Sequence, residues 1–483
     1  MSGYPETIDL FVAGRWRPGT GGRARQVINP ATGEPICTLH DASDADMDEA
    51  AEAAWHGFIE WRRWAPADRA ALIRRAAAAL RARSADIARI VTLEQGKPIA
   101  EARGEVIRAA EILEWDAGEA QRAYGRIVES ARDLRQSVQM RPIGPVAAFS
   151  TWNVPVVSPA RKIAGALAAG CSIVIKASEE TPGGAVALVK CFEEAGLPPG
   201  VVNLVFGDPE AISRRLIASP RIRMATLTGP LHAGRAIARL CADQLKPAIL
   251  ELGGHSPLIV CDDVDPAAVA RLVARSRYRN AGQICTAPTR VMVQARSYER
   301  FVAAFADETQ GIRVGDGMRE GAAMGPLANP RRLAAMERYV ADAAARGARV
   351  ETGGARLGDR GFFFAPTVLT EVPAEALVMQ EEPFGPIAPI AAFDTLEEAV
   401  ARGNALPYGL AAFAFTKSLD RAAELAAGLE SGSLCLNHVN GAALPELPLG
   451  GIKASGYGHE GGAESLHAYM TRMVVSEAIG ADI

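Results

Sequence analysis

The sequence predicts an α/β protein built on parallel sheets, and two observations carry this prediction. Short apolar runs alternate with amphipathic helices between VAAFS at residue 146 and AILELGG at residue 248. Strands and helices that alternate at this spacing are typical of βαβ units. The alternation resumes after Gly254, which predicts a second α/β domain. A length of 483 residues is compatible with about two or three domains.

The first third of the chain predicts a strand followed by helices. IDLFVAGRW, from residue 8, is strand-like, and apolar residues then recur at three- and four-residue spacing over Asp44–Trp61 and Pro66–Leu93. This period predicts amphipathic helices. In the middle region, Ser158 and Pro159 form a plausible N-cap and first-turn pair for a helix that ends at Gly170.

The second region predicts further strands in SPLIVCDD, RVMVQ and FFFAPTVL, a helix ending at Arg277 and a long helix over Pro330–Arg346. Two strand-like stretches lie apart from the others, SARDLRQSVQMRPIG at 130–144 and AYMTRMVVSEA at 468–478. Strands without local partners usually pair with another domain or subunit. We therefore expect an oligomerisation arm, and with it a homodimer or homotetramer.

Composition excludes several classes of function. Hydrophobic residues make up 49% of the chain and charged residues 22%, which is the balance of a globular protein. A net charge of −4 gives no dominant basic face, so we expect no nucleic-acid partner. No apolar run reaches the roughly 18 residues of a membrane helix, and the start, MSGYPETIDL, lacks the pattern of a signal peptide. We expect a cytoplasmic protein with no membrane partner.

One of the seven cysteines stands in an unusual setting. The seven are scattered without a C-x-x-C pair, so we expect reduced thiols and no metal site. Cys285, in NAGQICTAPTR, has polar neighbours on an irregular stretch just before a predicted strand, where active-site loops lie in α/β proteins. A thiol of pKa about 8.5 is only roughly 3% ionised at pH 7, so a nucleophilic cysteine needs an electropositive setting or a base. From this segment alone, a buried inert thiol fits as well as a nucleophile.

Two other segments carry side chains suited to assist a nucleophile. Glu251, in ELGGHSP, ends an apolar run and precedes two glycines that allow close backbone approach, so its carboxylate can activate a water. Asn153, in FSTWNVP, precedes a predicted helix, and its amide can donate to an oxyanion. Taken singly, each residue is more often a turn or cap residue.

Taken together, many segments of the chain match one family in order. They are TWNVP, VIKASEETP, LPPGVVNLVFG, LTG, ELGGHSP, GQICTAPTR, MGPL, EEPFGPIAPI, NALPYGLAAFAFT and PLGGIKASGYGHEGG. Over essentially its whole length the chain resembles the aldehyde dehydrogenase superfamily, and within it the branch of succinate semialdehyde and α-ketoglutarate semialdehyde dehydrogenases. The resemblance implies NAD(P)-dependent oxidation of an aldehyde to an acid. It also implies a Rossmann-like NAD(P)-binding domain over 1–122 and 142–253, an α/β catalytic domain over 254–449, and a small β oligomerisation arm over 123–141 and 466–483.

The resemblance assigns roles residue by residue. Cys285 would attack the aldehyde, the Asn153 amide and the Cys285 N–H would hold the resulting oxyanion, and Glu251 would activate the water that hydrolyses the thioester. The positions implied to bind the cofactor are Trp152, Lys176, Ser178, Glu179, Gly229, Pro230, Leu252, Glu382 and Phe384. Among these, a carboxylate at Glu179 accepts the ribose 2′-hydroxyl of NAD and repels the 2′-phosphate of NADP. NAD is therefore favoured, and NADP use stays open.

The chain also departs from the family pattern. Pro230 stands where the family usually has Ser, which removes a hydroxyl and a backbone donor, although proline is acceptable at the first position of a helix. Leu227, Val154 and Leu449 stand where Phe is more usual. The last two are expected to reshape packing or the substrate tunnel.

Two arginines suggest the substrate class. Arg161 and Arg279 match positions where the semialdehyde dehydrogenases hold a remote carboxylate, for which a guanidinium offers a bidentate fork. His438 matches a tunnel-lining position and is the third candidate substrate contact. We expect a short semialdehyde acid as substrate. Three alternatives stay open: a neutral aliphatic or aromatic aldehyde, a CoA-acylating reaction, against which Glu251 argues, and a non-catalytic scaffold of the same fold.

Overall fold

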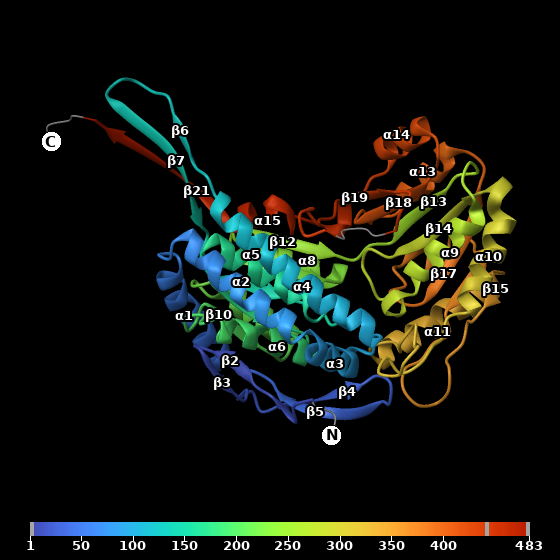
Figure 1. Ribbon diagram of the computed structural model, residues 1–483, viewed down its shortest axis with the longest axis horizontal. Coiled ribbons are helices and arrows are strands. Elements are labelled where there is room, and N and C mark those ends of the chain that lie inside the picture. The colour runs from blue at the N-terminus through green and yellow to red at the C-terminus, as the bar shows by residue number, and fades with distance from the viewer. Residues whose placement is uncertain (1–3, 440–443, 480–483) are drawn as a thin grey trace.

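A computed structural model describes residues 4–439 and 444–479. Figure 1 shows two lobes side by side and a long arm that leaves the first lobe. Each lobe is built on one large sheet with helices packed against it, so the predicted α/β class is confirmed. The domain boundaries drawn from the sequence stay a prediction.

The sheet of the first lobe is parallel at its centre. Strands β8 to β12 pair in the order β12-β11-β8-β9-β10, each neighbour parallel to the next. Antiparallel strands close both edges, β20 beside β12 and the β2–β3 hairpin beside β10. The strands are β2 Leu10–Val12, β3 Arg15–Arg17, β8 Val146–Phe149, β9 Ile173–Lys176, β10 Val202–Val205, β11 Met224–Gly229, β12 Ala248–Leu252 and β20 Gly456–Tyr457.

Helices enclose this sheet, and their apolar residues form one large core with it. They are α1 Asp44–Trp61, α2 Pro66–Ala82, α3 Ser84–Gln95, α4 Ile99–Glu119, α5 Val157–Ala169, α6 Pro182–Glu194, α7 Pro209–Ala218, α8 Leu231–Asp243 and α15 Gly462–Ala468, with a short 3-10 turn at Ala120–Arg122. Helix α1 has the predicted bounds. The predicted helix over Pro66–Leu93 is instead two helices, because the chain breaks at Arg83, whose φ of −95° and ψ of 10° are not helical.

The start of α5 also differs from the expectation. Its N-cap is Val156 and not Ser158, and no side chain of the segment itself caps it; the Ser158 hydroxyl is buried without a partner. Glu105 of α4 replaces the local cap, since its Oε1 accepts from Val156 N at 2.8 Å and from Val157 N at 3.3 Å. The predicted stop is confirmed, because Gly170 takes the left-handed conformation that ends the helix, with φ 91°.

The sheet of the second lobe runs β15-β16-β17-β14-β13-β18-β19, and only the β15–β16 pair is antiparallel. Its strands are β13 Ser256–Val260, β14 Pro288–Gln294, β15 Arg349–Thr352, β16 Thr367–Thr370, β17 Ile387–Phe393, β18 Ala411–Phe415 and β19 Ser433–Leu436. Its helices are α9 Pro266–Arg277, α10 Tyr298–Gln310, α11 Pro330–Ala345, α12 Leu377–Gln380, α13 Leu396–Asn404 and α14 Leu419–Gly428, with 3-10 turns at Arg279–Gly282 and Ala295–Ser297. The helix ending at Arg277 is thus confirmed.

The arm is a three-stranded sheet of β6 Arg126–Val128, β7 Leu134–Pro142 and β21 Met470–Ala478. Both predicted strands are present, but each has a partner in its own chain: β7 and β21 pair antiparallel over their full lengths. The range 466–483 begins inside α15, where Leu466 is buried in the core of the first lobe. A second small sheet joins β1 Thr7–Ile8, β4 Ala24–Asn29 and β5 Glu34–His40, and one further 3-10 turn spans Lys453–Ser455.

The two lobes meet tightly at the connection between α3 and α4. Gly96 ends α3 with φ 96°, and Gly317 and Gly325 of the second lobe lie against this turn. A Cβ at Gly325 would lie 2.0 Å from the Gly96 carbonyl oxygen, and a Cβ at Gly317 would lie 2.5 Å from the Lys97 carbonyl oxygen. Side chains at these two glycines would therefore force the lobes apart.

Candidate active site

The candidate residues of the first lobe gather at one edge of its sheet. Asn153 follows β8, Lys176 ends β9, Gly229 ends β11, and Glu251 is the penultimate residue of β12. These strands are parallel neighbours. Their carboxyl ends therefore share an edge, which is where ligands bind in open α/β sheets.

Cys285 lies between the 3-10 turn Arg279–Gly282 and strand β14 of the second lobe. The Asn153 amide donates from Nδ2 to the Gln283 carbonyl at 3.0 Å, two residues before Cys285. Gly254, three residues after Glu251, lies so close that a Cβ there would be 2.8 Å from the Cys285 carbonyl oxygen. Segments from three distant parts of the chain thus converge around this cysteine.

The thiol of Cys285 lies in an electronegative setting. It is the one cysteine of the described residues that is not buried. Desolvation raises its pKa to about 12, with further increases from the charges of Glu382 and Glu251, while the backbone N–H groups of Cys285 and Thr286 lower it. The resting sulfur is therefore a thiol and not a thiolate. A nucleophilic role requires that a base take its proton as it reacts.

Glu251 is a buried carboxyl group, 4% exposed. Burial raises its pKa well above the ordinary value, and the charge of Glu460 raises it further, whereas Lys162 and Arg161 lower it. Its Oε1 has no hydrogen-bond partner within the described residues. An orphaned carboxylate oxygen in this position is free to accept a proton from a bound water or thiol.

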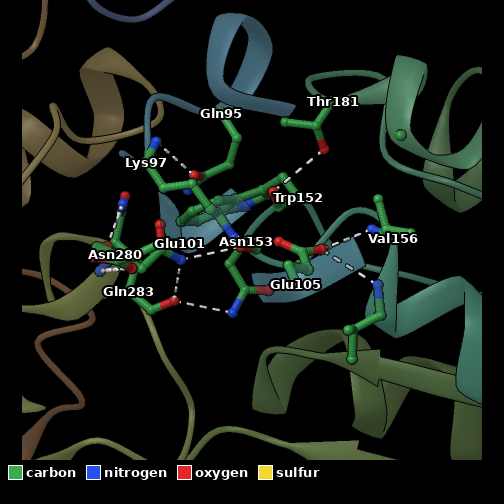
Figure 2. A network of polar contacts seen from close by, with 12 residues as sticks. Gln95, Lys97, Glu101, Glu105, Trp152, Asn153, Val156, Thr181, Asn280 and Gln283 are labelled. Atoms are coloured by element: carbon green, nitrogen blue, oxygen red, sulfur yellow. Dashed lines mark hydrogen bonds and ion pairs between the residues drawn. The ribbon is translucent and has the colours of Figure 1, made fainter. Parts of the chain in front are cut away.

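A dense polar network fixes the backbone and the side chain of Asn153 (Figure 2). Thr151 Oγ1 donates to Asn153 Oδ1 at 2.7 Å, which orients the amide. The Asn153 carbonyl accepts from Lys97 Nζ at 2.7 Å and from Asn280 Nδ2 at 3.0 Å. Within the described residues, only one of the two amide N–H groups has an acceptor, the Gln283 carbonyl. The other can donate to an oxyanion.

The candidate cofactor residues come from both lobes. Lys176 and Glu179 form an ion pair, and Ser178 Oγ accepts from Glu180 N at 3.2 Å. In the second lobe, Glu382 Oε1 accepts from Gly254 N at 3.2 Å, and burial raises the pKa of Glu382 to about 7. The ring of Phe384 meets Trp152 edge to face, with centroids 5.4 Å apart.

Pro230 occupies a different helix position from the one expected. It is the N-cap of α8 and not its first residue, and no side chain of residues 4–439 or 444–479 caps this helix. The first N–H groups of α8, which follow Gly229, therefore have no capping partner, and such an end binds phosphate groups. Leu252, at the end of β12, is buried and packs against α8, since a Cβ at Gly234 would lie 2.4 Å from its side chain.

The three candidate substrate residues lie in different settings. Arg161 of α5 is buried at 6% exposure near Glu460, Asp116 and Glu251, and its Nη1 has no hydrogen-bond partner in the part of the chain that the structure describes. Arg279 is exposed and lies near Glu101 of α4. His438 is exposed as well. Arg161 is thus a buried cation and Arg279 an exposed one, and their joint role in holding a remote carboxylate stays a prediction.

Several polar residues around the site escaped the sequence analysis. Lys97 and Glu105 form a buried ion pair at 2.5 Å, and Lys162 pairs with Glu460 beside Glu251. Arg277, fully buried, donates from Nη2 to the Gly385 carbonyl at 2.7 Å and to the Ile387 carbonyl at 2.5 Å, next to the loop that carries Phe384. The signal in the sequence that could have revealed such buried residues was a charged residue on an otherwise apolar helix face.

The comparison with known proteins decides the family. The model of the aldehyde dehydrogenase family matches residues 16–475. The chain belongs to the aldehyde dehydrogenase family. This aldehyde dehydrogenase is 47% identical to 4-(hydroxymethyl)benzenesulfonate dehydrogenase TsaD1 of Comamonas testosteroni, over 96% of each chain. It is 38% identical to succinate-semialdehyde dehydrogenase [NADP(+)] GabD of Escherichia coli, over 95% of each chain.

A solved structure agrees with the sequence comparison. The NAD+ complex of an aldehyde dehydrogenase from Bacillus cereus superposes with a TM-score of 0.95 at 32% identity, covering 98% of this chain and 97% of that one. This aldehyde dehydrogenase is accordingly an NAD(P)-dependent oxidoreductase. No helix of the described residues is long and apolar enough to cross a membrane. Among the same residues, no cluster of His, Cys, Asp and Glu is suited to hold a metal ion.

Proposed function

We propose that this aldehyde dehydrogenase oxidises an aldehyde with a remote anionic group, in the first place a short semialdehyde acid such as succinate semialdehyde or α-ketoglutarate semialdehyde. The chemistry rests on one observation: the segments of Cys285, Asn153 and Glu251 converge at the carboxyl edge of the first sheet. A nucleophile, an oxyanion donor and a base are the set that covalent oxidation of an aldehyde needs.

In the first half of the reaction, the Cys285 sulfur attacks the aldehyde carbon, and the thiol proton passes to Glu251. The carbonyl oxygen becomes an oxyanion, which the free N–H of the Asn153 amide and the Cys285 backbone N–H stabilise. Bound NAD(P) supplies the hydride acceptor. Loss of hydride from the thiohemiacetal carbon leaves a thioester on Cys285.

In the second half, Glu251, which has released the thiol proton to solvent, removes a proton from a water that attacks the thioester and passes this proton to the leaving Cys285 sulfur. The carbon–sulfur bond breaks, the acid leaves, and Cys285 regains its proton. Glu251 favours this hydrolytic outcome over transfer to CoA. Analysis of the product with and without CoA tests the assignment: free acid is expected in both cases, and an acyl-CoA product would contradict it.

The residues at the sheet edge fit a dinucleotide. The start of α8 offers backbone N–H donors to a diphosphate, and Glu179, which pairs with Lys176, would present its carboxylate to the adenosine ribose. Because a carboxylate there repels a 2′-phosphate, we infer that NAD is preferred over NADP. Glu382 and Phe384 lie on the opposite side, where the nicotinamide ribose and ring would bind.

The anionic substrate class is supported by Arg161 and by the relatives. The guanidinium is buried with one unpaired nitrogen, which can bind an anion at little further desolvation cost. One relative is named for a semialdehyde acid and a closer one for a benzenesulfonate. A carboxylate and a sulfonate both present anionic oxygens to a guanidinium. The second candidate substrate is therefore a sulfonated aromatic aldehyde.

Matched substrate pairs test this proposal. Succinate semialdehyde is compared with butanal, and 4-formylbenzenesulfonate with benzaldehyde, each by steady-state kinetics with NAD and with NADP. The member of a pair that carries the anion should have the higher kcat/KM. Arg161→Met should reduce the ratio of the two kcat/KM values, anionic over neutral, by roughly 30- to 150-fold, the equivalent of about 2 to 3 kcal/mol. Arg271→Met, at an exposed position of α9, is the control.

The ratio within a pair is the decisive quantity. Arg161 also lowers the pKa of Glu251, so Arg161→Met changes the base for every substrate, and only the ratio isolates contact with the anion. An unchanged ratio would contradict an anion contact at Arg161. The pair with the larger ratio identifies the carboxylate or the sulfonate class.

We further propose that the arm joins copies of this chain into a homodimer or homotetramer. Tyr124, Ile127 and Val474 in and next to the arm are 74%, 80% and 70% exposed. The strand register places Ile127 and Val474 on opposite faces of the arm, so both faces expose apolar side chains that a second copy can cover. Light scattering after size-exclusion chromatography should give a multiple of the chain mass, and Ile127→Asp with Val474→Asp should lower it. A monomeric wild type would contradict the proposal.

A further inference from the structure

A buried ion pair next to the site has no part in the proposed chemistry. Lys97 lies on the connection between α3 and α4, and Glu105 lies two turns into α4. Their side chains are 3% and 5% exposed, and Lys97 Nζ lies 2.5 Å from Glu105 Oε2. Removing two charges from water costs several kcal/mol per ion, which the pair recovers only with good geometry and further hydrogen bonds.

The further hydrogen bonds of this pair go to one short segment. Lys97 Nζ donates to the Asn153 carbonyl, and the second oxygen of Glu105 accepts from Val156 N and Val157 N. The pair therefore holds both ends of the turn from Asn153 into α5. This turn depends on the pair, because α5 has no side-chain cap of its own.

The same end of α4 holds the cysteine loop. Glu101 Oε2 accepts from Asn280 N at 2.9 Å, and Asn280 Nδ2 donates both to the Asn153 carbonyl and to the Gln283 carbonyl, at 3.0 and 3.3 Å. Asn280 has φ 50°, a left-handed conformation that costs energy outside glycine. The start of α4 thus fixes the oxyanion donor and the nucleophile loop relative to each other (Figure 2).

We propose that Lys97 and Glu105 are positioning residues that set the location of the Asn153 amide during attack on the aldehyde. The inference rests on the oxyanion role proposed for Asn153. An oxyanion donor must stay within a few tenths of an ångström of its productive position. The Asn153 carbonyl and amide belong to one residue, so a shift of the carbonyl on loss of Lys97 moves the amide as well.

The main variant is Lys97→Met, which keeps the length of the side chain and removes the donor. Glu105→Gln is the second variant, because it keeps an oxygen to accept from Val156 N and weakens only the ion pair. Arg103→Met, at an exposed position of the same helix, is the matched control. Each is measured for the burst of reduced cofactor in the first turnover, kcat/KM for the aldehyde, the Kd of NAD, the rate of Cys285 alkylation and Tm.

In Lys97→Met the burst rate and kcat/KM for the aldehyde should fall by about 10- to 100-fold. The Kd of NAD and the alkylation rate should stay within about twofold, because neither depends on the Asn153 amide. Glu105→Gln should lie between wild type and Lys97→Met, Lys97→Arg should recover part of the burst rate, and Arg103→Met should match wild type. If Lys97→Met does not fold, Glu105→Gln carries the test by the same criteria.

A double-mutant cycle with Asn153→Ala separates this inference from the proposed function. If Lys97 acts through Asn153, Lys97→Met should cause no further loss in the Asn153→Ala background. A wild-type burst rate in Asn153→Ala alone would overturn the oxyanion role and the inference with it. Three results would overturn the inference and leave the proposed function standing. They are losses that multiply in the double variant, a normal kcat/KM in a folded Lys97→Met protein, and parallel losses of NAD binding and Cys285 alkylation.

Discussion

The reactivity of the Cys285 thiol in the free enzyme offers a quantitative test of the site's electrostatics. Desolvation, together with the charges of Glu382 and Glu251, raises its pKa from an ordinary value of 9.0 to about 12. At pH 8 the thiolate fraction is then about 10⁻⁴, against roughly one in ten for an ordinary thiol. Alkylation should therefore be on the order of 10³-fold slower than for an ordinary thiol.

The assay is alkylation by iodoacetamide, followed by mass spectrometry of the peptide that contains Cys285, from about pH 6 to about pH 10. The rate should rise about tenfold per pH unit without a plateau. Glu382→Gln should raise the rate at pH 8, where this carboxyl, with a pKa of about 7, is ionised. Glu424→Gln, at an exposed position of α14, should leave the rate unchanged.

Two results would refute this reasoning. A plateau of the rate near pH 8 would show that the thiol ionises there and that its setting is electropositive. A slower reaction in Glu382→Gln would show that this carboxylate assists ionisation of the thiol and does not oppose it.

Three further predictions concern the base, the cofactor and the fold. Glu251→Gln should keep a burst of reduced cofactor in the first turnover but lower the steady-state rate by about 10²- to 10⁴-fold; a full steady state would exclude it as the base. Glu179→Gln should improve kcat/KM with NADP relative to NAD by roughly tenfold, about 1.4 kcal/mol, and an unchanged ratio would count against its role. Burial by itself raises the pKa of Asp46, but hydrogen bonds from Ser43 N, Thr20 N and Arg17 outweigh it and lower the pKa from 3.8 to about 2. This stabilisation is complete above the unfolded pKa of 3.8 and is lost as pH falls through the folded pKa of about 2. Asp46→Asn should therefore lower the free energy of unfolding by about 2 kcal/mol at pH 7 and by little when the pH is near the folded pKa. Denaturant titrations at the two pH values measure the losses, and equal losses would contradict this prediction.

Local patterns in the sequence predicted most of the helices and strands. They failed where residues distant in the sequence determine how an element begins or pairs. The apolar period gave Asp44–Trp61 its bounds, because Ser43 and Asp46 form a capping box within the same segment. The expected cap at Ser158 was wrong because the cap comes from Glu105, 51 residues earlier in the chain. Pairing between β7 Leu134–Pro142 and β21 Met470–Ala478 joins segments that lie far apart in the sequence, and no local pattern reveals such a partner.

The candidate site was predictable to a similar degree. Resemblance to a family placed Cys285, Asn153 and Glu251 together, which their own neighbours in the sequence could not do. The position of Glu105 on a largely apolar face of α4 was a signal of burial, but its partner Lys97 lies on the connection between α3 and α4, where lysine is ordinarily exposed, so the pairing could not be predicted. The different burial of Arg161 on α5 and Arg279 on the turn that follows α9 could not be predicted either, because burial depends on tertiary packing.

The close approach of Gly317 and Gly325 to the turn at Gly96 has a practical consequence for engineering. Hybrid enzymes that combine one lobe of this chain with the other lobe of a relative would join surfaces that fit without any side chain between them. Transplanting 95–98 and 317–325 as a unit should preserve that fit, whereas exchanging either stretch alone would mismatch backbone against backbone at the turn whose Lys97 contacts Asn153.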